Sequence, residues 1–308
     1  MMSLAVTEVM QSAGVSWPEA HRDADAMLRL ALAMQEATGF DNIALPFCMT
    51  VEAEAYGATV DFGNATVHPR VRGTQLPHDG SATLAKPDFH AGRAGALLRA
   101  LRRARALRPD VALIGNLVGP FSLLAMLADP LRVLRWTHRD PDLLRRHLEI
   151  FVENLVEFGR LQKEAGADAI CIAEPTATGE ILGGPLFRSL ALPALHSMCQ
   201  SLRSANVGII VHICGDIRPI ENELLELPSD AVSFDSVVNI VALREKSPAW
   251  QVMGNLDAFL LQRGPADTIL RRCHALLQGG VRLLAPACGV IPTTPVSHLK
   301  AMCDATHL

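Results

Sequence analysis

Residues 207–215 read VGIIVHICG, a short apolar run that ends in His212, Cys214 and Gly215. Val and Ile favour strands, and a continuous apolar run of this length is typical of a strand buried on both faces of a parallel sheet. We predict a strand over residues 207–212. Similar short runs predict further strands at 43–46, 58–62, 111–115, 168–173, 231–235, 251–254 and 281–285.

Helical patterns lie between most of these strands. From residue 20 to 38 apolar residues recur with gaps of three and four, and Gly39 follows as a C-terminal cap. We predict helices at 19–38, 89–107, 142–164, 187–204, 265–277 and 295–304. Strand–helix alternation over this length predicts one domain, residues 1–308, folded as a (β/α)8 TIM barrel. An open doubly wound sheet is the alternative.

The composition excludes several classes of protein. The 308 residues are 49% apolar and 19% charged, which excludes a disordered chain. The formal net charge of −4 gives no reason to expect a nucleic acid or an anionic membrane as partner. The N-terminus lacks the basic and apolar regions of a secretory signal. Gly and Pro interrupt the uncharged stretch 111–128, which therefore predicts a strand, a loop and a helix instead of a membrane span. We expect a soluble, cytoplasmic protein.

Cysteine and histidine residues are the candidates for chemistry. An odd number of cysteines, seven, without an export signal favours metal binding or catalysis over disulfides. In an extended chain His212 and Cys214 point the same way, and both are ligand types that zinc prefers. A lone H-x-C pattern is by itself more typical of core residues. However, Cys288 follows the predicted strand 281–285 and should emerge at the same end of a barrel. Three protein ligands with no obvious fourth are typical of an open zinc site, the kind found in catalytic zinc centres.

Together with several longer segments, these residues resemble a known group of enzymes. It is similar to the uroporphyrinogen decarboxylase superfamily, and within it to the methylcobamide:coenzyme M methyltransferases. The segments that carry the similarity run from residue 46 to residue 302: PFCMTVEAEAYG (46–57), GNLVGPFSLLAML (115–127), HICGD (212–216), GNLD (254–257) and LAPACGVIPTTPVSHLKAM (284–302).

The resemblance implies a (β/α)8 barrel and a zinc ion held by His212, Cys214 and Cys288, which would be the catalytic residues. It further implies methyl transfer from a methylcobamide, carried on a separate corrinoid protein, to a small thiol that zinc holds as thiolate. Coenzyme M is the acceptor that the resemblance suggests. The chain is rich in Arg and has four Lys, a composition typical of a GC-rich genome. In a bacterial source, tetrahydrofolate or homocysteine would be the alternative acceptors.

Other residues at predicted strand ends are weaker candidates. Glu174 is either a fourth zinc ligand or a hydrogen-bonding partner, with a solvated loop carboxylate as the alternative. Asn116, Asp235 and Asn255 are candidates for substrate binding or for support of the site. We expect the remaining cysteines, Cys48 among them, to be core residues. The chain begins close to the first helix of the family, so a barrel with a modified or shortened N-terminal region is expected.

Two other functions remain open. A uroporphyrinogen decarboxylase-type lyase needs no metal, but it needs an Arg-rich substrate motif near the N-terminus, which we do not find. A non-catalytic module that binds a corrinoid protein is the third possibility. Retention of all three ligand residues argues against it, because unused exposed thiols are prone to oxidation.

Overall fold

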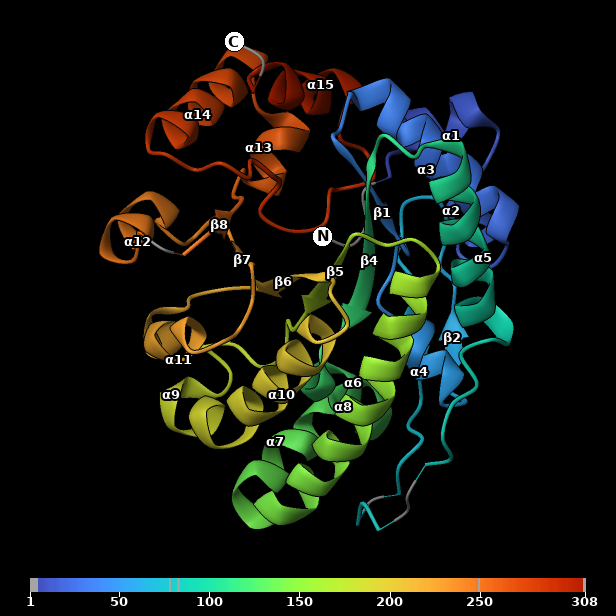
Figure 1. Cartoon of the computed structure of the whole chain (residues 1–308), viewed down its shortest axis with the longest axis vertical. Coiled ribbons are helices and arrows are strands. Elements are labelled where there is room, and N and C mark those ends of the chain that lie inside the picture. The colour runs from blue at the N-terminus through green and yellow to red at the C-terminus, as the bar shows by residue number, and fades with distance from the viewer. Residues whose placement is uncertain (1–4, 78, 82–83, 249, 307–308) are drawn as a thin grey trace.

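In the computed structural model, six parallel strands form the centre of the protein and helices surround them (Figure 1). The structure describes residues 5–77, 79–81, 84–248 and 250–306. The strands are almost wholly buried, as the continuous apolar runs predict. In sheet order they are β1 (Asn42–Leu45), β4 (Ala112–Val118), β5 (Ala169–Ala173), β6 (Gly208–Ile213), β7 (Ala231–Phe234) and β8 (Val252–Met253).

Beyond β8 the barrel continues through a segment that carries isolated parallel bridges. Leu283 pairs with Met253, and Pro286 pairs with Leu256. The predicted strand at 281–285 therefore lies at the expected place but forms two bridges instead of a continuous ladder. Gly254 donates to the Leu283 carbonyl and Leu256 to that of Ala285, which fixes the path of the chain toward Cys288.

The long helices match the predicted ones closely. The helix predicted over 19–38 is interrupted, because the Asp23 side chain accepts hydrogen bonds from the amides of Asp25 and Ala26 and starts a new helix there. That over 187–204 begins with a π-helical turn. The main outer helices are α3 (Ala24–Thr38), α5 (Gly92–Leu107), α8 (Pro141–Glu164), α10 (Leu192–Arg203), α14 (Ala266–Gln278) and α15 (Val296–Asp304). The shorter helices are α1 (Thr7–Ala13), α2 (Trp17–Ala20), α4 (Val51–Ala55), α6 (Pro120–Ala128), α7 (Pro130–Arg139), α9 (Gly183–Leu186), α11 (Glu221–Leu225), α12 (Ile240–Lys246) and α13 (Ala258–Arg263), with η1 (Phe187–Ala191) and η2 (Arg218–Ile220).

The two ends of the described chain meet on one side of the barrel. α15 packs against α3, and both lie near α1 in Figure 1. The Thr7 amide donates to the Pro292 carbonyl at 2.7 Å, and the Val296 amide donates to the Glu8 carboxylate at 3.1 Å. In the described part of the chain, helices α1 to α3 precede β1.

One predicted strand has a different role. Residues 58–62 were expected in the barrel, but β2 (Thr59–Asp61) pairs antiparallel with β3 (Arg70–Arg72) in a separate two-stranded ribbon. Both strands are short and partly exposed. A barrel strand needs apolar residues toward both the interior and the helices, and β3 carries an Arg at each end. The prediction of a barrel strand here was wrong.

The stretch 111–128 folds as strand, loop and helix, as predicted. β4 extends beyond the predicted end at Gly115, through Asn116 to Val118, and α6 follows. The Asn116 amide donates to the Pro46 carbonyl at 3.2 Å, so this polar residue is satisfied inside the sheet. Across the described residues, no helix combines the length and apolar character that crossing a membrane requires.

Glu52 on α4 gives the fold a dependence on pH. Its side chain is 1% exposed, and one carboxyl oxygen accepts a hydrogen bond from the Val118 amide at 2.9 Å. Burial raises the pKa of Glu52 from 4.5 to about 7. Between these values the folded chain holds a proton that the unfolded chain releases. The free energy of unfolding therefore falls as the pH rises through this range, by up to roughly 3 kcal/mol.

Glu52→Gln is expected to remove this contribution, because the amide keeps an acceptor for Val118 and has no charge to bury. At pH 8 the variant should be more stable than the wild type by about 1–3 kcal/mol, and near pH 4.5 the two should be equal. Urea denaturation at both pH values measures the difference. Glu36→Gln, at an exposed position of α3, is the control. Equal pH dependence in wild type and Glu52→Gln would contradict the prediction.

Candidate metal and active site

Three side chains that could hold a metal ion meet at the carboxyl end of the barrel. His212 lies on β6 between Ala173 of β5 and Ser233 of β7, and Cys214 follows two residues later. Cys288 approaches from a segment 74 residues away in the chain. The ligand atoms of the three residues lie within 4.8 Å of one another. The structure thus brings together the three residues that the sequence predicted as ligands.

Their spacing fits one tetrahedral ion. The Cys214 sulfur lies 3.3 Å from His212 Nε2 and 3.9 Å from the Cys288 sulfur. Tetrahedral zinc with ordinary bond lengths places two sulfurs roughly 3.8 Å apart, and a sulfur and a nitrogen roughly 3.6 Å apart. Three donors of this type leave one position open. The donor set and its spacing therefore fit zinc at a site of the open kind.

The residues behind the ligands hold them in place. Ser233 is fully buried, and its hydroxyl lies 3.1 Å from His212 Nδ1, which leaves Nε2 facing the cysteines. The Gly215 amide donates to the Asp235 carboxylate at 3.3 Å, which fixes the turn after Cys214. Such partners orient metal ligands and tune their basicity.

The hydrogen bond between the two thiols shifts their pKa values in opposite directions. A hydrogen bond from Cys214, and then one from His212, lowers the pKa of Cys288. The bond to Cys288 and burial raise the pKa of Cys214. One member of the pair is thus readily ionised, and the anionic sulfur favours cation binding.

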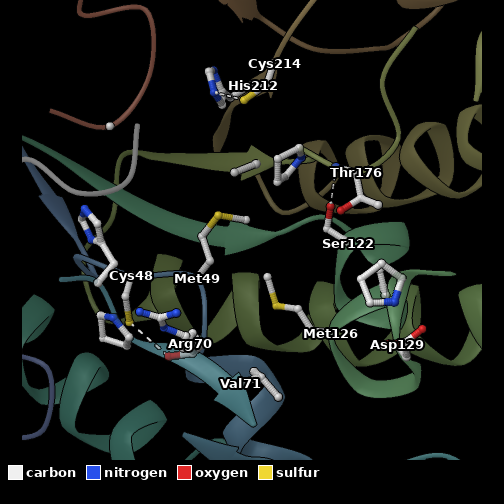
Figure 2. Close-up of a pocket in the computed structure, with 18 of the residues that line it drawn as sticks. Cys48, Met49, Arg70, Val71, Ser122, Met126, Asp129, Thr176, His212 and Cys214 are labelled. Atoms are coloured by element: carbon white, nitrogen blue, oxygen red, sulfur yellow. Dashed lines mark hydrogen bonds between the residues drawn. The ribbon is translucent and has the colours of Figure 1, made fainter. Parts of the chain in front are cut away.

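The three residues open into a cavity of about 790 Å³. Figure 2 shows His212 and Cys214 at one side of it, Met49 and Met126 in its middle, and Cys48 and Arg70 on the far side. The full lining, in chain order, is Cys48, Met49, Thr50, His68, Pro69, Arg70, Val71, Gly73, Thr74, Ser122, Ala125, Met126, Asp129, Pro130, Ala173, Pro175, Thr176, His212, Cys214, Cys288 and Gly289. The polar end formed by His212, Cys214 and Cys288 therefore faces a largely apolar chamber.

Glu174 lies beside the site but outside the group of ligand atoms. Its side chain is fully buried, and it accepts hydrogen bonds from the Phe121 amide (2.9 Å) and the Ser122 hydroxyl at the start of α6. Its own amide donates to the His212 carbonyl at 2.9 Å. Burial raises the pKa of Glu174 to about 7, against the lowering effect of these hydrogen bonds. Of the predicted roles, the geometry favours a hydrogen-bonding partner over a fourth ligand.

The three predicted substrate-binding residues do not line the cavity. The Asn255 amide donates to the carbonyls of Asp235 and Val238, both at 2.8 Å, and Asp235 in turn accepts from Gly215. Asn116 is fully buried within β4. Asp235 and Asn255 form a chain of hydrogen bonds that supports the turn after Cys214. Their positions fit the supporting role that the sequence also allowed.

The sequence did not single out most of the chamber's other residues. Arg70 and Val71 come from β3, which lacks the apolar pattern of a barrel strand. Met126 and Ser122 lie on α6, and nothing in the sequence distinguishes them from the other residues of that helix. Cys48 was expected in the core, and it is 3% exposed, but it also borders the chamber. These residues border the chamber because β3 and α6 lie over this end of the barrel.

Comparisons with known proteins agree with this architecture. The sequence matches the uroporphyrinogen decarboxylase (URO-D) family over residues 1–308. It is 31% identical over 306 residues to the methylcobamide:CoM methyltransferase MtaA of Methanosarcina barkeri, covering 97% of this chain and 89% of that protein. It is 27% identical over 303 residues to the methylated-thiol–coenzyme M methyltransferase of Methanosarcina mazei, covering 97% and 81%.

The solved structure of a methyltransferase from Methanosarcina mazei superposes with a TM-score of 0.94 at 30% sequence identity, covering 99% of this chain and 91% of that one. The resemblance inferred from the sequence motifs and the barrel fold are both confirmed. The chain belongs to the uroporphyrinogen decarboxylase family, and its similarity places it among the methyltransferases of that family.

Proposed function

We propose that the protein transfers a methyl group from a methylated corrinoid, carried on a partner protein, to a small thiol, with zinc at His212, Cys214 and Cys288. The observation that carries the proposal is the three-ligand cluster at the wall of the 790 Å³ chamber. Methyl transfer to coenzyme M is what the names of the Methanosarcina relatives state. A bound zinc ion would supply the Lewis acidity that keeps an acceptor thiol ionised near neutral pH.

The chain's own residues prepare the acceptor. The two cysteines and His212 would hold the metal, and their anionic sulfurs add electron density that keeps the acceptor sulfur nucleophilic. Ser233 holds the His212 ring in one orientation. The Met49 and Met126 side chains give the chamber an apolar lining between His212 and Cys214 on one side and Arg70 on the other.

The reaction balances without a redox partner. The acceptor thiol gives up its proton on binding. Its sulfur then forms a bond to the methyl carbon, while the cobalt–carbon bond breaks and its electron pair stays on cobalt. Methyl-Co(III) becomes Co(I), and the products are a methyl thioether and the demethylated corrinoid.

The chamber favours a small thiol with at most one acidic group. Arg70 is the single Arg or Lys among the described residues that line it. Coenzyme M fits this pattern. A tetrapyrrole with several carboxylates would need several cations, so the lining gives the decarboxylase alternative little support.

Methyl transfer is tested with methylcobalamin as a soluble donor and a panel of thiols, including coenzyme M and homocysteine. We expect thiol-dependent formation of Co(I), seen in the visible spectrum under anaerobic conditions, only with the zinc-loaded protein. Release of CO₂ from uroporphyrinogen by metal-free protein, with no methyl transfer, would support the lyase instead. Binding of a corrinoid without turnover for any thiol would support the non-catalytic module.

Binding of the acceptor is also expected to release about one proton per site near pH 7, because a free alkyl thiol is mostly protonated there and the bound form is the thiolate. Titration calorimetry in two buffers of different ionisation enthalpy measures the number of protons. S-methyl coenzyme M, which has no thiol proton, is the matched control. Equal heats for coenzyme M in both buffers would show that no proton leaves and would refute thiolate formation.

A further inference from the structure

A second cavity, of about 370 Å³, lies next to the active-site chamber. It is lined by Asp129, Arg132, Arg135, Trp136 and Arg139. Asp129 also lines the chamber, where Figure 2 shows it on the side away from Cys48. The other four residues lie on α7, which packs against α6 and α8. We call this cavity the arginine groove.

The three arginines share one face of the helix. Positions 132, 135 and 139 are three and four residues apart, so at about 100° per residue they fall within an arc of roughly 60°. Neighbouring like charges at these spacings repel one another. Helix α7 carries no acidic residue from Pro130 to Arg139. Among the described residues, none of the ion pairs involves these three guanidinium groups. The one carboxylate among the described residues that line the groove is that of Asp129, which accepts a hydrogen bond from the Arg132 backbone amide at 3.1 Å.

Two side chains that line the groove, Arg132 and Trp136, are held in place by contacts within the protein. Arg132 donates through Nη1 to the carbonyls of Leu76 and Pro77, at 3.0 and 3.3 Å. This arginine lies in the first turn of α7, where the helix dipole disfavours a cation. The Trp136 ring is 7% exposed and stacks on His147, so it forms a rigid wall. Arg135 and Arg139 are exposed at the other side.

We propose that the arginine groove binds a phosphate-bearing ligand. Guanidinium groups bind phosphate oxygens through paired hydrogen bonds, and three of them along about 10 Å of helix match a ligand with several negative charges better than a single carboxylate. Such a ligand would offset the repulsion among the arginines. Because Asp129 borders both cavities, the phosphate belongs either to a free compound or to the nucleotide tail of the corrinoid, whose ring would occupy the chamber.

Sodium pyrophosphate is the first probe, with binding measured by titration calorimetry at constant ionic strength. We expect saturable binding of one pyrophosphate to the wild type, weakened at least tenfold by Arg135→Gln combined with Arg139→Gln. Arg99→Gln combined with Arg102→Gln is the matched control. It removes the same charge at the same kind of exposed helix position, on α5, and should change the affinity less than twofold. No saturable binding, or equal weakening by both pairs, would overturn the proposal.

A second arm identifies the source of the phosphate. This arm depends on the proposed function, whereas pyrophosphate binding requires neither zinc nor thiol and can succeed or fail independently. Cobalamin carries a phosphodiester in its nucleotide tail, and cobinamide lacks the nucleotide. If Arg135→Gln combined with Arg139→Gln weakens the binding of cobalamin but not that of cobinamide, the corrinoid is the ligand. If the double variant binds each corrinoid as tightly as the wild type does but no longer binds pyrophosphate, the ligand of the groove is a free phosphate compound.

Discussion

Cys214→Ser and Cys288→Ser are each expected to lose zinc while the barrel stays folded. Zinc binds thiolate far better than a serine hydroxyl, which stays protonated near neutral pH. Loss of a partner that only orients a ligand typically weakens metal binding 10–100-fold, so loss of a ligand should exceed about 100-fold. Methyl transfer should fall below detection. Elemental analysis of wild type and variants, beside circular dichroism, measures both properties.

Cys48→Ser is the matched control for these variants. Cys48 borders the same chamber, but its sulfur contacts the Thr50 hydroxyl and Arg93 and is not in the ligand cluster. We expect this variant to keep about one zinc per chain. Gross unfolding of the Cys214 and Cys288 variants would mean that these residues are needed for packing. Full zinc retention in both variants, or no zinc in the reconstituted wild type, would remove the proposed mechanism.

Gly119→Ala should be among the most destabilising small substitutions in the protein. A Cβ at Gly119 would lie 2.7 Å from Glu174 Cδ and 2.9 Å from Glu174 Cβ. Glu174 cannot move aside without breaking its hydrogen bonds to Phe121 and Ser122. Overpacking of a buried site costs about 1–3 kcal/mol, and we expect a loss of about 3 kcal/mol in the free energy of unfolding. Urea denaturation followed by circular dichroism gives the value.

Gly208→Ala is the control, since it adds the same methyl group at the start of β6. Its Cβ would meet the Ala169 Cβ at 3.3 Å, and no charged group lies in the way. We expect a change below about 1 kcal/mol there. Because the Glu174 amide also binds the His212 carbonyl, Gly119→Ala should lower zinc occupancy as well. Equal stability of the two alanine variants would show that Glu174 is not held as described.

The sequence predicted the barrel because its signals are local. Short runs of Val, Ile and Ala predict buried strands, and helical periodicity between them predicts the outer layer. The pair His212 and Cys214 needs only the alternation of an extended chain. Cys288 could be added because the carboxyl ends of barrel strands meet at one face. Where such periodicity is weak, at 58–62 and 281–285, the predictions were wrong or only partly met.

The surroundings of the candidate site could not be predicted in this way. Glu174 follows β5, but only the packing of α6 against that strand end shows that its carboxyl caps Phe121 and Ser122. Asp235 and Asn255 lie at strand ends as expected, but their side chains turn into hydrogen bonds within the loops. The direction of a loop side chain depends on backbone dihedrals that no periodic pattern reports.

By itself, then, the sequence determined the strand–helix alternation, the ligand pair on β6 and the family to which the chain is similar. The tertiary structure alone decided how the β2–β3 ribbon brings Arg70 to the chamber and how α7 lines the arginine groove beside it. The physical reason is the range of the interactions. Residue periodicity arises from hydrogen bonds between near neighbours or from one buried face, whereas a cavity arises where distant segments fail to fill the space between them.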